Sequence, residues 1–202
     1  MKPRSVVLGL LALALSQLHP FAVEPEKLDC GKAQTRPHGC EYSFTLSSEE
    51  FVSTFGKKED GTLNYRVPLL KVYDKAGVQV FDRIGYAKDL VKALQEMTAS
   101  PTPVERRGTL ADELARVRTS TGATPAASGL ARGDFYVVTY EADWCEPCKA
   151  QLKDVRWFAD SNRKTGIEIV RVGANFMTFD ADTQKRLAGH TSSAPKPKEK
   201  ER

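Results

Sequence analysis

The chain has 202 residues, 28% of them charged, and a formal net charge of +4 at pH 7. Two of the positive charges, Lys2 and Arg4, lie at the extreme N-terminus, and charges of both signs are scattered along the rest of the chain. A net charge this close to zero, with charges of both signs scattered along the chain, excludes strong electrostatic binding of nucleic acid or of a charged membrane as a basis for function. The length fits one domain of ordinary size with additional segments.

The N-terminus has the pattern of a secretory signal peptide. Lys2 and Arg4 precede an apolar stretch from Val6 to Leu15, and small residues lie near its end. The stretch is too short to span a bilayer, and no cysteine follows the expected cleavage region for lipid attachment. We therefore predict a signal peptide over residues 1–22 and an exported protein without stable membrane insertion. A bacterial periplasm is the expected compartment, and an extracellular destination fits the same residues.

Residues 23–56 are expected to form an N-terminal extension with a short strand and a short helix. Apolar and polar residues alternate over 42–46, which predicts the strand. A capping-box pattern beginning at Ser47 predicts a helix that ends at Phe55.

Residues 57–97 contain a predicted hairpin and a predicted helix. Two strand-like runs, over 69–73 and 78–86, are joined by a short loop ending in Gly77, which favours antiparallel pairing. The helix begins at about Lys88, because apolar residues then recur at helical spacing.

Residues 98–134 are predicted to be a linker with one short helix. The linker is rich in Pro, Thr, Ala and Gly, and the pair Thr109 and Asp112 has the spacing of a helix cap for a helix over 109–117.

Residues 135–190 contain the second group of predicted elements. The apolar run from Phe135 to Tyr140 is typical of a strand covered on both faces, and it is followed by an amphipathic helix and a strand over 167–172. A further short helix is predicted over 180–187, and residues 191–202 are predicted to be a disordered tail.

The sequence Cys145-Glu146-Pro147-Cys148 lies between this strand and this helix. Two cysteines three positions apart at a helix start can form a disulfide across the first turn. The free backbone N–H groups and the helix dipole stabilise a thiolate on the first cysteine. We therefore predict that Cys145 is the nucleophile and Cys148 the resolving thiol.

The other two cysteines, Cys30 and Cys40, flank a polar loop. An even number of cysteines in an exported chain favours a structural Cys30–Cys40 disulfide, but other pairings and a second redox pair stay open. The main chemical alternative is a zinc site that Cys145 and Cys148 share with Cys30, Cys40 or a histidine. The spacing of Cys30 and Cys40 is too wide for a usual zinc knuckle, so we predict no metal.

The strand, the motif Trp144-Cys-Glu-Pro-Cys-Lys149, the helix and the strand resemble the first half of the thioredoxin superfamily fold. The family's second half, with a cis-proline loop, a hairpin and a final helix, does not follow, because the only later prolines are Pro195 and Pro197. Residues 57–97, beginning with Arg66-Val67-Pro68, look like that half. The resemblance implies a three-layer α/β/α fold with a mixed central sheet. It also implies that the two halves of the family fold occur in reversed order, with the C-terminal-type half at 57–97 and the N-terminal-type half at 135–190.

Two alternatives to this circular permutation stay open: a truncated second domain behind a degenerate first one, or two chains that exchange halves in a dimer. Permutation is favoured because each half alone would bury too little apolar surface. The oligomeric state is not predicted.

The resemblance further implies a thiol–disulfide oxidoreductase that needs no organic cofactor. Its partners would be disulfides or thiols of client proteins and a thiol–disulfide electron donor. Trp144, Pro147, Val67 and Pro68 would form the substrate-binding rim of the disulfide. The competing interpretations are that Trp144 is a core aromatic residue and that Pro68 is an ordinary strand-edge proline.

Glu146 indicates the direction of electron flow. A carboxylate beside Cys145 disfavours its thiolate and so makes the couple more reducing, by roughly 30 mV for one pKa unit. We therefore predict a reductant, with Glu146 tuning the potential and relaying a proton in competition with Glu141 and Asp143. Thr139 stands where the family usually has a buried acid, and Lys153 replaces a helix proline.

Two other functions remain open. One is a binding or assembly module of an envelope apparatus, in which the Cys145–Cys148 disulfide is fixed. The other is a dithiol oxidase or isomerase, which would have a more positive reduction potential.

Overall fold

The computed structural model describes residues 39–56, 64–105, 108–175 and 181. The predicted signal peptide, Cys30, the predicted tail and all but one residue of the predicted helix over 180–187 lie outside the described residues.

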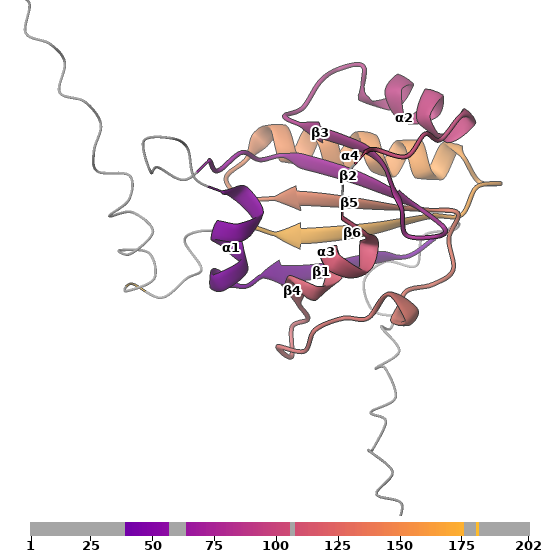
Figure 1. Ribbon diagram of the computed structural model, residues 1–202. Helices are drawn as coiled ribbons and strands as arrows, with labels where there is room; N and C mark the ends of the chain where they lie inside the picture. The colour runs from indigo at the N-terminus through magenta and orange to yellow at the C-terminus, as the bar shows by residue number, and fades with distance from the viewer. Residues whose placement is uncertain (1–38, 57–63, 106–107, 176–180, 182–202) are drawn as a thin grey trace, which may run out of the picture.

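A six-stranded sheet in the order β3-β2-β5-β6-β1-β4 forms the centre of the described part (Figure 1). The inner strands β5, β6 and β1 run parallel, while β2 and β3 on one side and β4 on the other are antiparallel to their neighbours. The predicted α/β class with a mixed central sheet is therefore confirmed. The strands are β1 (Glu41–Leu46), β2 (Leu69–Asp74), β3 (Gln79–Ile84), β4 (Val117–Arg118), β5 (Phe135–Glu141) and β6 (Ile167–Gly173).

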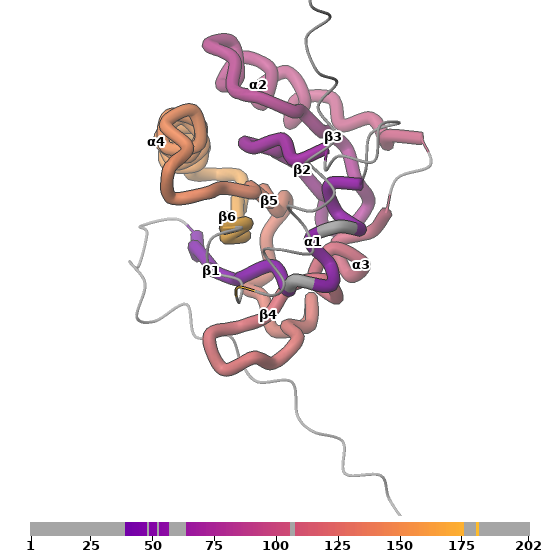
Figure 2. The backbone as a smooth tube through the Cα atoms, turned by 90° about the vertical axis from the view of Figure 1, so that its left-hand side faces the viewer, coloured from indigo at the N-terminus to yellow at the C-terminus, as the bar shows by residue number. Residues whose placement is uncertain are grey.

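Helices cover both faces of the sheet, with α2 and α4 on one side and α1 and α3 on the other (Figure 2). Each face has its own apolar core, because successive side chains of a strand point to opposite faces. Residues of β5 contribute to both cores, which explains why its sequence lacks alternation. The helices are α1 (Ser48–Phe55), α2 (Leu90–Ala99), α3 (Leu110–Ala115) and α4 (Glu146–Ser161), with a short 3₁₀ helix η1 (Ala127–Gly129).

The local signals of the sequence are seen in the structure. The Ser47 hydroxyl accepts the backbone N–H of Glu50 at 3.2 Å, and Thr109 and Asp112 form a reciprocal capping box at the start of α3. The loop between β2 and β3 contains Gly77, whose φ of +77° lies in the region that glycine adopts without steric cost. The two strands that it joins are antiparallel neighbours, as predicted.

Two segments differ from expectation. The helix predicted over 109–117 ends at Ala115, and Val117 instead pairs with Leu46 as part of β4. The strand of the predicted N-terminal extension is β1, which lies inside the sheet between β6 and β4. Segment 23–56 therefore adds a strand to the central sheet.

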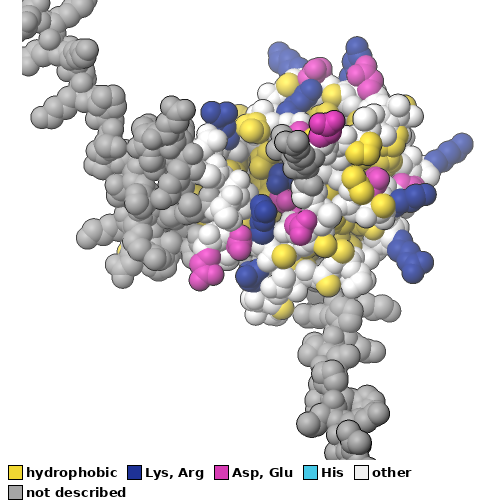
Figure 3. All heavy atoms as spheres, in the orientation of Figure 1, with side chains coloured by type: hydrophobic (Ala, Val, Ile, Leu, Met, Phe, Trp, Pro, Cys, Tyr) yellow, Lys and Arg dark blue, Asp and Glu magenta, His cyan; other side chains and the backbone are white. Residues whose placement is uncertain are grey.

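Charged side chains of both signs are interspersed over the face shown in Figure 3, without a single-sign patch. This distribution agrees with the small net charge of the sequence. Among the described residues, none of the helices is both long and apolar enough to cross a membrane.

The linker over 98–134 is anchored to the sheet through Glu113 of α3, which is only 4% exposed. Its carboxylate accepts Lys71 Nζ at 2.6 Å and the Tyr73 hydroxyl at 3.0 Å, and it also accepts the hydroxyl of Tyr140. These partners come from β2 and β5. One carboxylate therefore connects the linker to both halves of the chain.

Replacing Glu113 by Ala should lower the free energy of unfolding by about 3–5 kcal/mol, because it leaves a half-buried ammonium group and two buried hydroxyls without their acceptor. Denaturation in urea measures the effect. The control is Glu96→Ala, which removes an exposed carboxylate paired with Lys92 at 3.7 Å and should change stability by less than about 1 kcal/mol. Equal effects of the two substitutions would contradict an anchoring role for Glu113.

Candidate functional site

Cys145 and Cys148 form a disulfide at the junction of β5 and α4, with a Cα–Cα distance of 5.2 Å. Cys145 is the N-cap of α4, and its Sγ accepts the backbone N–H of Cys148 at 3.1 Å. This N–H also donates to the carbonyl of Cys145 at 3.1 Å, and its position at the helix start would favour a thiolate at the sulfur once the disulfide is reduced. Pro147 fits here because the first turn of a helix does not need its missing N–H.

The segment before β2 lies against this disulfide. Val67 packs on the buried cluster of Ala142, Cys145 and Cys148. The Val67–Pro68 peptide bond is cis, Pro68 is buried, and its carbonyl accepts the N–H of Gly85 at 2.8 Å. The structure therefore brings together site residues from segments 57–97 and 135–190, which are far apart in the sequence.

Trp144 is 60% exposed, so it is not a core residue. Its ring lies 5.9 Å from the ring of Tyr65 in a T-shaped arrangement, and the Tyr65 hydroxyl donates to the carbonyl of Ala174. Glu146 and Pro147 are exposed beside it. These side chains form an amphipathic rim next to the disulfide.

The two cysteine residues are almost equally buried: Cys145 is 3% exposed and Cys148 is 2% exposed. Burial therefore does not distinguish the attacking cysteine from the resolving one. Hydrogen bonding does differ between them, because Cys145 Sγ accepts the N–H of Cys148.

No protein-family model, curated protein or solved structure matches this chain. The interpretation of the site therefore depends on its own residues and geometry.

The three carboxylates proposed as proton relays all have partners. Glu141 accepts Arg171 Nε at 2.8 Å, and Asp143 accepts the side-chain amide of Asn175 at 2.9 Å. Glu146 forms an ion pair with Lys149 at the surface. The nearby ammonium group offsets part of the effect that the Glu146 charge has on Cys145.

Sequence analysis missed a buried polar pair under the start of α4. Thr139 and Gln151 are both 0% exposed, and Gln151 Nε2 donates to Thr139 Oγ1 at 3.0 Å. A signal was present, because Gln151 lies at helical spacing between Cys148 and Val155, on the buried face of α4. Lys153, by contrast, is exposed and plays no part in this pair.

Cys40 lies at the other end of the sheet. It precedes β1, whereas Cys145 follows the carboxyl end of β5, and both strands run parallel to β6. Direct exchange with Cys145 would require a sulfur to cross about 20 Å, the length of a strand of this size. The alternative of a direct redox relay is therefore not supported. Because Cys30 lies outside the described residues, the Cys30–Cys40 disulfide stays a prediction.

The zinc alternative also lacks support in the described part of the chain, where no group of three His, Cys, Asp or Glu residues is placed to hold a metal ion.

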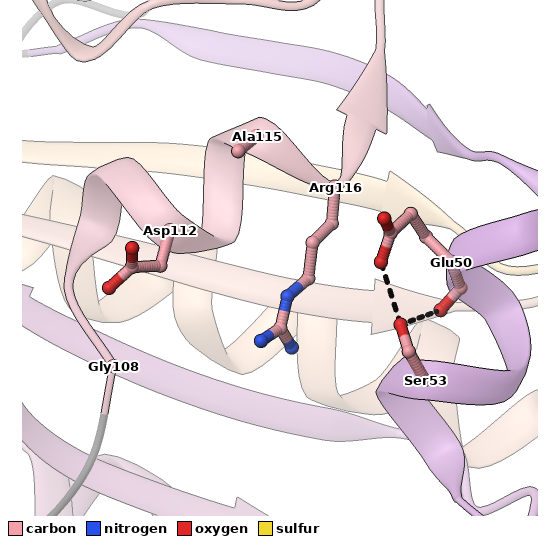
Figure 4. A pocket seen from close by; sticks show the side chains of 6 residues that line it. All are labelled: Glu50, Ser53, Gly108, Asp112, Ala115 and Arg116. Atoms are coloured by element: carbon pink, nitrogen blue, oxygen red, sulfur yellow. Dashed lines mark hydrogen bonds between the residues drawn. The ribbon is translucent and has the colours of Figure 1, made fainter.

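An open pocket of about 440 Å³ lies between α1 and α3 (Figure 4). Arg116 extends into it, but the acidic groups around it are already engaged: Asp112 in the cap of α3, and Glu50 with the Ser53 hydroxyl at 2.6 Å. Neither cysteine of the disulfide lines this pocket. It therefore has no direct part in the disulfide chemistry.

Tyr65 provides a test of the packing beside Trp144. Burial raises the pKa of Tyr65 to about 12, whereas an unfolded tyrosine titrates near 10. The unfolded state therefore loses its proton first, so the stabilisation is complete below about pH 10 and decreases as the pH rises towards 12.

Tyr65→Phe should remove this contribution and reduce the loss of stability between about pH 10 and 12. Urea denaturation of both proteins across this range measures it. At about pH 8 the variant should be less stable by roughly 1 kcal/mol, because it lacks the hydrogen bond to Ala174. Parallel stability curves for the two proteins would show that Tyr65 is not buried as described.

Proposed function

We propose that this chain is an exported thiol–disulfide oxidoreductase that reduces disulfides of client proteins through Cys145 and Cys148. The observation that carries the proposal is the disulfide at the N-cap of α4, where the Cys148 N–H points at Cys145 Sγ at 3.1 Å. This hydrogen bond favours Cys145 as the attacking thiolate.

We also propose that the fold is a thioredoxin fold with its halves in permuted order. Three features support this: the parallel β5-α4-β6 unit with the disulfide, the antiparallel β2-β3 hairpin beside β5, and the packing of α2 on the same face as α4. The two halves pair within one chain along β2 and β5, so no exchange of halves between two chains is needed.

In the proposed reaction, the Cys145 thiolate attacks one sulfur of a client disulfide. The Cys145–client bond forms, the client disulfide breaks, and the other client sulfur leaves as a thiolate. Cys148 then loses its proton to solvent and attacks Cys145 Sγ, which releases the second client thiolate and forms the Cys145–Cys148 disulfide. The two electrons come from the dithiol, which a thiol electron donor must regenerate.

The client would bind over the rim around the disulfide. Trp144 offers a large exposed aromatic ring, Val67 packs on the two cysteines, and the exposed Pro147 lies between them in the sequence. Pro68, the residue after Val67, is buried. Exposed apolar surface of this kind is typical of sites that bind another polypeptide.

A second candidate function is a binding or assembly module with a fixed disulfide. The burial of both cysteine residues, 3% and 2% exposed, favours it, because a fixed disulfide needs no access for a reacting thiol.

Insulin reduction in the presence of dithiothreitol separates these two functions. The oxidoreductase should accelerate the appearance of turbidity at least tenfold over dithiothreitol alone, and Cys145→Ser should abolish the acceleration. Cys148→Ser should instead trap a client on Cys145 as a mixed disulfide that a non-reducing gel detects. Without acceleration and without trapping, the fixed-disulfide function would be favoured.

Reduction potentials test the role of Glu146. Glu146→Gln should raise the potential by less than about 30 mV, the equivalent of one pKa unit, because Lys149 and solvent screen the carboxylate. Lys149→Gln removes the opposite charge and should lower the potential by a similar amount. Equilibration with dithiothreitol or glutathione measures both. Shifts of the same sign would contradict an electrostatic role for this pair, and a wild-type potential near about −120 mV would indicate an oxidase.

A further inference from the structure

Gln151 is a buried side chain whose hydrogen-bonding capacity is only half used. It is 0% exposed, and Nε2 donates to Thr139 Oγ1 at 3.0 Å. Its carbonyl oxygen Oε1 is also buried and has no hydrogen-bond partner among the described residues. Such an unpaired buried acceptor is unfavourable and is uncommon in folded proteins. It therefore needs a physical explanation.

The position of Gln151 on α4 indicates a hydrogen-bond partner for this oxygen. Gln151 follows Cys148 by three residues on α4, so the two side chains share one face of the helix. Helical side chains lean towards the N-terminus, which directs Gln151 back towards Cys148. Both residues are buried, so water does not readily take the place of a protein partner.

Reduction of the disulfide changes the hydrogen-bonding needs of this region. In the disulfide, Cys148 Sγ carries no hydrogen. When a dithiol donor transfers two electrons to the Cys145–Cys148 bond, the bond breaks and the donor becomes a disulfide. Of the donor's two protons, one is taken up by Cys148 and the other goes to solvent, which leaves Cys145 as the thiolate. A buried S–H donor then appears one helical turn before Gln151.

We propose that Gln151 is a positioning residue whose Oε1 accepts a hydrogen bond from the Cys148 thiol in the reduced protein. This inference rests on the proposed redox function of the disulfide. The unpaired acceptor in the oxidised state and the new donor in the reduced state satisfy each other. The hydrogen bond therefore stabilises the dithiol relative to the disulfide.

Other acceptors near the disulfide are already engaged. Glu141 is paired with Arg171, Asp143 with Asn175, and Glu146 with Lys149. Val67 and Ala142, which pack on the two cysteines, are apolar and offer no side-chain acceptor. On this face of α4, Gln151 Oε1 is a buried side-chain acceptor without a hydrogen-bond partner among the described residues.

The test compares Gln151→Met with Thr139→Val in the full chain with Cys30 and Cys40 replaced by Ala. Met keeps the length of Gln but removes the acceptor, so the equilibrium with dithiothreitol should move about three- to tenfold towards the disulfide. For a two-electron couple this equals about 15–30 mV. Thr139→Val breaks the same buried pair but keeps Oε1, so it should move the equilibrium less than twofold. Equal shifts in both variants, or no shift in Gln151→Met, would overturn the proposal.

A second measurement does not depend on redox equilibrium or on the stability of the variant. In a Cys145→Ala chain without Cys30 and Cys40, Cys148 is the only thiol. Its S–H stretching band in the Raman spectrum should lie below the frequency of a thiol without a hydrogen bond, and Gln151→Met should return it to that frequency. A wild-type band at the unbonded frequency would overturn the proposal.

These readouts use dithiothreitol and spectroscopy, not a client. If the chain does not accelerate insulin reduction but Gln151→Met shifts both readouts, the proposed function fails and the hydrogen bond stands. If insulin is reduced but neither readout changes, the hydrogen bond fails and the function stands.

Discussion

The antiparallel ladder between β2 and β5 determines most of the site. It runs from the pair Leu69–Tyr140 to the pair Asp74–Phe135, and it joins segments more than sixty residues apart in the sequence. Because Val67 lies two residues before this ladder and Cys145 closely follows it, the register of the strands decides what packs on the disulfide. A shift by one residue would turn every β2 side chain to the opposite face of the sheet and disrupt both cores. The fold and the site therefore depend on one register.

Buried polar side chains are hydrogen-bonded to different extents on the two faces of the sheet. On the face of α1 and α3, Glu113 satisfies three donors from two strands, which stabilises the position of the linker. On the face of α4, Gln151 satisfies one partner and leaves one acceptor open. A fully satisfied group is typical of a structural role, whereas a buried acceptor without a partner needs an explanation, and the proposed hydrogen bond from the Cys148 thiol is such an explanation. Gln151 lies three residues after Cys148 on the buried face of α4.

Much of the secondary structure could be predicted from local patterns, because periodicity, caps and turns act over a few residues. The hairpin, the run over 135–140 and the capping box of α3 are such cases. β4 was missed because a two-residue strand is too short to have a period, and its pairing partner in β1 lies far away in the sequence. The buried roles of Glu113 and Gln151 were missed for a related reason. Their polarity indicates exposure. The helical spacing of Gln151 between Cys148 and Val155 does indicate a buried face, but only the strand register brings Glu113 and Gln151 to their partners.

Glu146 and Gln151 should shift the reduction potential of the Cys145–Cys148 disulfide in opposite directions. The burial of each group determines which shift is larger. Glu146 favours the disulfide by disfavouring a thiolate at Cys145, but its side chain is 78% exposed and pairs with Lys149, so solvent and the ammonium group screen its charge. The proposed hydrogen bond from Cys148 to Gln151 favours the dithiol, and it lies in the interior, where an unmade hydrogen bond is not replaced by water. The interior effect should therefore be the larger one, and the couple should be less reducing than Glu146 alone indicates. A couple reduces any disulfide of higher potential, so in the proposed function the direction of electron flow depends on the donor and the client more than on the residue between the two cysteines.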